Sequence, residues 1–180
     1  MLKAMLIAVA LAFLPSAACA GEGGKLEALV EDICIGGRLD ESLLGTMVKQ
    51  VAQFYEMKVK ELALDDLRLA MPEATSGWGI YAGDEAFIIS FARKPANPGT
   101  SQSCTITTKT SDTAGIKAFV EQKFRSRKMV DETQGSSSII AYELALLGFS
   151  KPLYLSVQTS KSTDPRLQFT SVSVYDVPNP

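Results

Sequence analysis

The fold class of this chain can be inferred from residues 78–93, which have the sequence WGIYAGDEAFIISFAR. Every second residue from Phe87 to Phe91 is large and apolar, a pattern typical of a strand with one buried face. Gly83 and Asp84 form a two-residue turn with glycine first, which favours a tight hairpin. The two predicted antiparallel strands are Trp78–Ala82 and Ala86–Arg93.

Further strands are predicted after this hairpin, where apolar and polar residues alternate. Segment 138–147 also fits a helix ending at Gly148, but its two adjacent isoleucines and the preceding turn favour a strand. Phe169 and Val172 depart by one residue from strict alternation, which indicates a bulge near Ser171. The further predicted strands are the Cys104 segment, 129–134, 138–147, 152–160 and 167–177.

Helices are predicted before the hairpin and once between the later strands. Residues 25–35 repeat apolar side chains at helical spacing and end at a Gly-Gly pair, a common C-terminal signal. A second helix begins near Asp40, whose carboxylate can cap it. Its predicted apolar face consists of Leu44, Met47, Val48, Val51, Phe54 and Tyr55. The remaining helical segments are a short turn at 64–70 and a helix that follows Ser111 or Asp112 and ends at Arg125, Arg127 and Lys128.

This order of elements predicts an α+β fold. N-terminal helices are followed by a mainly antiparallel sheet of about six or seven strands, with one further helix inserted and one disulfide. The helices are expected to lie on one face of the sheet. Residues 21–180 are expected to form a single domain, with flexible ends at 21–24 and 178–180.

Residues 1–20, MLKAMLIAVALAFLPSAACA, have the pattern of a bacterial secretory signal peptide. Lys3 precedes an apolar run that is too short to cross a bilayer of about 30 Å as a helix. Cleavage is expected after Ala20, which leaves a periplasmic or secreted chain without a transmembrane segment. Lipidation at Cys19 is the alternative, although Ser16 occupies the position where that signal has a branched apolar residue.

The remaining two cysteines are expected to form a structural disulfide. Two cysteines in an exported chain usually pair. Cys34 lies on the apolar face of the first predicted helix and Cys104 lies in a predicted strand. The two are far apart in sequence and form no C-x-x-C motif, which disfavours a redox-active pair.

The charged residues exclude several classes of protein. The chain contains 18 Lys and Arg, 20 Asp and Glu, and no histidine. Without histidine there is no Ser-His-Asp or Cys-His catalysis and no histidine metal ligand. The net charge of −2 provides no basic surplus for nucleic acid. We expect no cofactor, no metal and no nucleic-acid partner.

Three groups of residues are candidates for a site. Trp78 and Tyr81 are candidate ligand contacts, although alternation puts them on opposite faces, so one of the two is expected in the core. Glu143 would suit acid–base chemistry if it were buried, whereas an exposed or ion-paired Glu143 would have a structural role. A candidate anion patch at the end of the last helix consists of Lys123, Arg125, Arg127 and Lys128.

No motif points to an activity. The glycines from Gly77 to Gly83 lack the G-x-G-x-x-G spacing, and no S-x-x-K or calcium-loop pattern is present. We therefore expect a non-enzymatic exported module that binds an envelope protein or a small ligand. The alternatives are an envelope assembly or structural protein that docks through its N-terminal helices, and a histidine-independent hydrolase based on a Ser/Lys or carboxylate pair.

Overall fold

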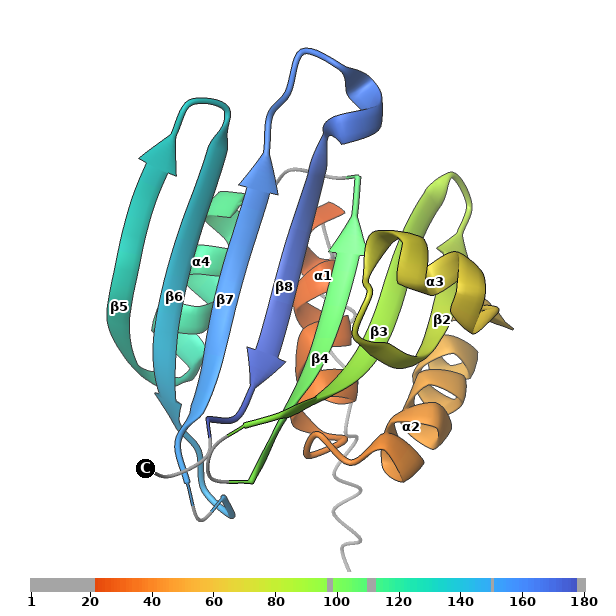
Figure 1. Ribbon diagram of the computed structural model, residues 1–180, viewed down its shortest axis with the longest axis horizontal. Coiled ribbons are helices and arrows are strands. Elements are labelled where there is room, and N and C mark those ends of the chain that lie inside the picture. The colour runs from red at the N-terminus through yellow and green to blue at the C-terminus, as the bar shows by residue number, and fades with distance from the viewer. Residues whose placement is uncertain (1–21, 97–98, 110–112, 150, 178–180) are drawn as a thin grey trace, which may run out of the picture.

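A computed structural model describes residues 22–96, 99–109, 113–149 and 151–177, and it has the predicted α+β fold. One antiparallel sheet contains eight strands in the order β1-β2-β3-β4-β8-β7-β6-β5 (Figure 1). The strands are β1 (Lys58–Glu61), β2 (Ala74–Ala82), β3 (Glu85–Pro95), β4 (Thr100–Thr108), β5 (Arg125–Gln134), β6 (Ser137–Ala145), β7 (Leu153–Ser160) and β8 (Phe169–Tyr175). The helices are α1 (Glu22–Leu29), its π-helical continuation η1 (Val30–Ile35), α2 (Glu41–Phe54), α3 (Leu64–Ala70), α4 (Thr113–Lys123) and the 3₁₀ turn η2 (Pro165–Leu167).

The sheet is built from two halves that each consist of a helix followed by four strands, with α3 inserted between β1 and β2 only in the first half and η2 between β7 and β8 only in the second. In the first half α2 precedes the antiparallel strands β1 to β4, and in the second α4 precedes β5 to β8. The last strand of each half meets the other in the middle of the sheet, where β4 and β8 pair antiparallel. This arrangement is a structural repeat that the sequence alone did not show.

The helices do not all lie on one face, which corrects the sequence-based expectation. Figure 1 shows α1, α2 and α4 behind the sheet and α3 in front of it. Trp78 packs toward α2, because a Cβ at Gly45 would lie 3.3 Å from its ring. The neighbouring Gly77 faces α3, and a Cβ there would lie 2.5 Å from Leu67. The missing side chain at Gly77 is what allows α3 to approach the second face.

The main core lies between the sheet and the helices α1, η1, α2 and α4. Its side chains come from one face of the strands, including Phe87, Ile89 and Phe91 as predicted. The predicted disulfide between Cys34 and Cys104 is present, with a Cα–Cα distance of 5.4 Å and no exposure of either residue. It joins η1 to β4 across the centre of the core.

Several element boundaries differ from the prediction. The described residues form eight strands rather than six or seven, because Lys58–Glu61 pairs with β2 although its exposed, charged sequence carries no strand pattern. Helix α1 begins at Glu22, within the stretch 21–24 that was expected to be flexible. Helix α4 ends at Lys123, and β5 begins at Arg125 because pairing with β6 extends the strand through the basic group.

The segment predicted at 138–147 is a strand, as preferred, but it runs over Ser137–Ala145 and ends two residues early, and the hairpin turn at Gly83 and Asp84 is confirmed. The bulge predicted near Ser171 is wrong, because β8 pairs in unbroken register with both neighbours. Phe169 therefore lies on the face opposite Val172 and Val174.

Some predictions lie outside the described residues. They concern the signal peptide at 1–20, the Cys19 site, the capping residues Ser111 and Asp112, and the C-terminal end at 178–180. Within the described part of the chain, none of the helices combines the length and the apolar character needed to cross a membrane.

Replacing both bridging cysteines by alanine is expected to lower the free energy of unfolding by about 4 kcal/mol, because the bond closes a loop between residues 70 positions apart. Urea denaturation of the oxidised wild type and the double variant measures this difference. Reduced wild-type protein is the control and should unfold at a midpoint close to that of the variant. An unchanged midpoint in the double variant would contradict a stabilising role for the bridge.

Candidate functional site

A groove of about 710 Å³ lies on the face of the sheet that α1, α2 and α4 leave open. One wall is the end of α3 and the segment that follows it, from Ala70 to Ala74. The floor is the middle of the sheet, where alternate residues of neighbouring strands point to the same side. The floor residues are Ser90 of β3, Ser103, Thr105 and Thr107 of β4, Ser171 and Ser173 of β8, and Gln158 of β7.

The hydroxyl groups in the middle of the floor form pairs across β4 and β8. The hydroxyl oxygens of Thr105 and Ser173 lie 2.8 Å apart, and those of Thr107 and Ser171 lie 2.9 Å apart. Each pair joins residues that are directly opposite in the register. One hydroxyl of a pair donates to the other, so a donor hydrogen and acceptor lone pairs are left for a ligand.

The floor of the groove has no ionisable side chain, whereas the outer strands on the same face are charged. Lys58 and Lys60 of β1 lie opposite Tyr81 and Gly79, and Arg127 of β5 lies opposite Glu143. The small neutral side chains between these edges create a shallow depression with an uncharged floor. Such a surface suits a neutral ligand, since a bound ion would lose hydration without gaining a partner of opposite charge.

The ends of the hydroxyl strip carry aromatic rings. Phe169 begins β8 and lines the groove, while Tyr175 ends the strand beside Ser103. The rings of Tyr175 and Tyr154 are stacked, with centroids 5.7 Å apart and planes 24° apart. From Phe169 to Tyr175 the strand covers about 20 Å at the usual rise per residue. Burial raises the pKa of the Tyr175 hydroxyl above its usual value.

The rim of the groove contains one lysine, Lys94, whose ammonium pairs with Glu73. An ion-paired ammonium is a poor base for activating a serine, so the Ser/Lys hydrolase alternative gains nothing from this arrangement. Among the described residues, no group of three or more His, Cys, Asp or Glu could hold a metal ion.

The two predicted aromatic contacts lie on opposite faces of β2. Trp78 is 6% exposed and belongs to the core beneath α2. Tyr81 is 41% exposed on the open face, and its hydroxyl lies over Gly79, where a Cβ would be only 2.6 Å away. Neither residue lines the groove. A role for Tyr81 in ligand contact stays a prediction, whereas the burial of Trp78 leaves its ring to packing.

The four predicted anion-binding cations are distributed over different elements. Lys123 of α4 pairs with Glu31, and Arg127 Nη2 lies 2.7 Å from Oε2 of Glu143. This pair also places Glu143 on the open face with an ion partner, which is the structural alternative considered for it. Arg125 shares the open face with Arg127. Glu31 and Glu143 offset the charges of Lys123 and Arg127. Anion binding at this cluster stays a prediction.

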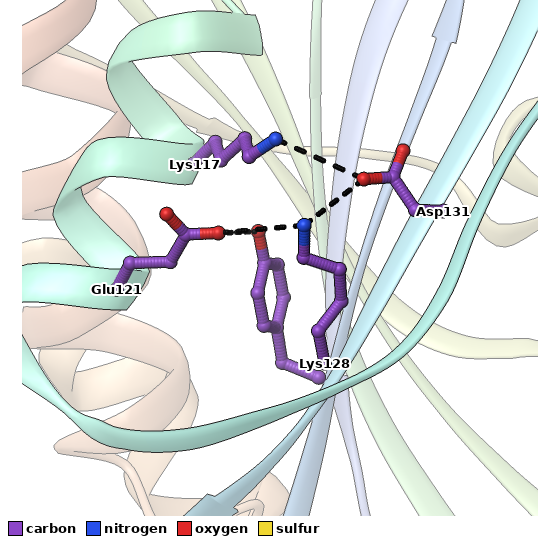
Figure 2. Close-up of polar contacts among 5 residues, drawn as sticks. Lys117, Glu121, Lys128 and Asp131 are labelled. Carbon is purple, nitrogen blue, oxygen red and sulfur yellow. Dashed lines mark hydrogen bonds and ion pairs between the residues drawn. The ribbon is translucent and has the colours of Figure 1, made fainter.

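Lys128 points to the other face of β5, toward α4. Figure 2 shows it between Glu121 and Asp131, with Lys117 also directed at Asp131. Lys128 Nζ lies 3.0 Å from Oδ2 of Asp131 and 3.9 Å from Oε1 of Glu121. The Lys128 ammonium lowers the pKa of Asp131. This network holds α4 against the sheet and is better explained by structure than by binding.

The sequence pattern did not predict the groove or its lining. The alternation in β8 does separate Phe169, Ser171, Ser173 and Tyr175 from the buried valines, so a one-sided polar strip was detectable. The strip becomes a site only because β4 lies beside it and α3 lies above the neighbouring strands, and neither fact follows from local pattern.

No family model matches the chain, and searches of curated proteins and of solved structures give no significant match.

Tyr142→Phe is expected to reveal a pH-dependent contribution to stability. The Tyr142 side chain is buried, its hydroxyl donates to Oε1 of Glu121 at 3.0 Å, and burial raises its pKa strongly above the usual value of about 10. As pH rises past about 10, the unfolded chain releases this proton while the folded chain keeps it, so the stabilisation is lost. The variant should be less stable by about 1 kcal/mol at neutral pH, and the difference should shrink near pH 11.

Urea midpoints at both pH values measure this effect, with Tyr81→Phe as the matched control at an exposed tyrosine. A difference between wild type and Tyr142→Phe that does not change with pH would argue against a buried, neutral hydroxyl.

Proposed function

We propose that this protein is an exported, periplasmic binding protein without catalytic activity, and that it holds a small neutral ligand in the groove on the open face of its sheet. The ligand is expected to be rich in hydroxyl or amide groups. The observation that carries the proposal is the floor of paired Ser and Thr hydroxyls without an ionisable group, bounded by charged outer strands. Ligand sites combine apolar surface with a few well-placed polar groups.

The walls of the groove support the same class of ligand. Met71, Pro72 and Phe169 supply apolar surface around the hydroxyl floor. A compound with apolar C–H faces and hydroxyl or amide edges matches both kinds of surface. Hydroxyls that act as donors and acceptors adapt to either edge, which favours a polyhydroxylated or amide-bearing compound over a purely apolar one.

Export is the second part of the proposal. It is supported by the signal-like pattern of residues 1–20 and by the buried disulfide, a bond that persists mainly in oxidising compartments. Cleavage after Ala20 would leave Gly21 as the first residue, close to the start of α1 at Glu22.

The groove can be tested by two-dimensional amide NMR with probes that differ in charge. The neutral probes are maltotriose and triglycine with an acetylated N-terminus and an amidated C-terminus. The anionic probe is trigalacturonate. The neutral probes are expected to shift the amide signals of Thr105 and Ser173, while trigalacturonate should leave them unchanged. Ser173→Arg fills the groove with a long charged side chain and should abolish the shifts.

The matched control for that variant is Ser137→Arg. It makes the same substitution on the same face of the sheet, in β6, but outside the groove. It should leave the shifts intact. The proposed ligand class would be refuted if Ser137→Arg and Ser173→Arg changed the probe-induced amide shifts equally. It would also be refuted if neither neutral probe shifted the amide signals of the wild type.

Expression of the full chain in a bacterium tests export. The expected product is a periplasmic chain that begins at Gly21 and lacks free thiols, as measured by intact mass before and after alkylation. A product that keeps residues 1–20, or that carries a lipid on Cys19, would contradict the proposed processing.

A further inference from the structure

A second groove, of about 530 Å³, lies between η1 and α2 on the helical side of the molecule. Its floor is formed by Ile35 of η1 and by Met47 and Val51 of α2. The residues that α2 contributes are spaced as one stripe of a helix, from Met47 to Phe54. The groove therefore has helical walls on both sides and exposes side chains rather than a free sheet edge.

An aromatic residue at the end of this groove is largely exposed. Phe54 is 78% exposed, although it belongs to the apolar face predicted for α2. Its ring lies at right angles to the ring of Tyr55, with centroids 5.0 Å apart. Leu44, Val48 and Val51 on the same helix are buried in the core, so α2 turns one part of its apolar face to the sheet and leaves another open.

The rim of the groove on η1 is acidic. Glu31 pairs with Lys123, whereas Asp32 takes part in none of the ion pairs among the described residues. The Asp32 carboxylate accepts a long hydrogen bond of 3.3 Å from the hydroxyl of Tyr55. Partial burial and the neighbouring Glu31 raise the pKa of Asp32, and the Tyr55 hydroxyl and Lys123 offset this only in part, so a further cation beside the carboxylate would stabilise its charged form.

We propose that this groove is a docking site for a basic amphipathic helix of a partner protein, with apolar side chains between Ile35, Val51 and Phe54 and a Lys or Arg on Asp32. A third helix can pack its ridges into the channel between two others. Burial of Phe54 by apolar side chains would supply the type of aromatic anchor that dominates many interfaces. The complementary charge would fix the orientation of the helix and exclude acidic competitors.

A second copy of this chain is a poorer occupant. A twofold dimer through the same patch would bring two sets of Glu31 and Asp32 together, because both subunits use the same surface. The chain as a whole carries a net charge of −2, which adds to this repulsion. A basic partner avoids both costs.

The test uses a labelled synthetic peptide of 14 residues, the length of α2, with Leu on one helical face and Lys on the other. Fluorescence anisotropy measures its binding to the mature protein. A peptide with Glu in place of Lys is expected to bind at least about tenfold more weakly. Phe54→Ala should weaken the Lys peptide by about tenfold or more, and Asp32→Asn should weaken the Lys peptide but not the Glu peptide.

Leu69→Ala is the matched control, because it removes an apolar side chain that is 87% exposed on α3, on the opposite face of the sheet from this groove. It should leave affinity unchanged, and urea midpoints should show that all variants stay folded. Equal binding of the Lys and Glu peptides, equal effects of Phe54→Ala and Leu69→Ala, or no binding of the Lys peptide would overturn the proposal. Dimers in light scattering that Phe54→Ala dissociates would identify a second copy as the occupant and would also overturn it.

Discussion

The antiparallel pairing of β4 with β8 is the contact that gives this molecule both its core and its open groove. Each strand is the last of its half, so the pairing joins the two halves into one sheet. On one side of the pair, Cys104 and Ile106 lie opposite Val174 and Val172 in the core. On the other side, threonine and serine hydroxyls meet to form the floor of the groove. Because side chains alternate with a period of two, a single register determines both surfaces.

The helices that cover the core bury some of their apolar side chains and leave others exposed. The disulfide fixes η1 to β4, and α2 buries Leu44 and Val48 against the sheet. The short turn from Gly36 to Asp40 then holds η1 and α2 at an angle that leaves a channel between them. A helix with apolar residues over a wide arc cannot bury all of them against one flat sheet. The exposed ring of Phe54 is the result.

Much of the fold was predictable because its signals are local. The hairpin turn at Gly83, the Asp40 cap and the alternation in β3 depend only on neighbouring residues, and all three agree with the structure. The errors arose where tertiary pairing outweighed local preference. Lys58–Glu61 is a strand only because β2 lies beside it, and the basic residues after Lys123 join β5 rather than α4. Phe169 breaks the apolar pattern because it lines the groove rather than the core.

Local chemistry in the chain was enough to predict the α+β class and the pairing of Cys34 with Cys104, and to exclude every mechanism that needs a histidine of this chain. The location of the candidate sites depended on contacts between distant residues. Thr105 and Ser173 are 68 positions apart, and Asp32 and Tyr55 are 23 apart, so only the folded chain brings them together. Patterns of hydrophobicity report which face of an element is buried, but they carry no information about which element covers it or which face stays open.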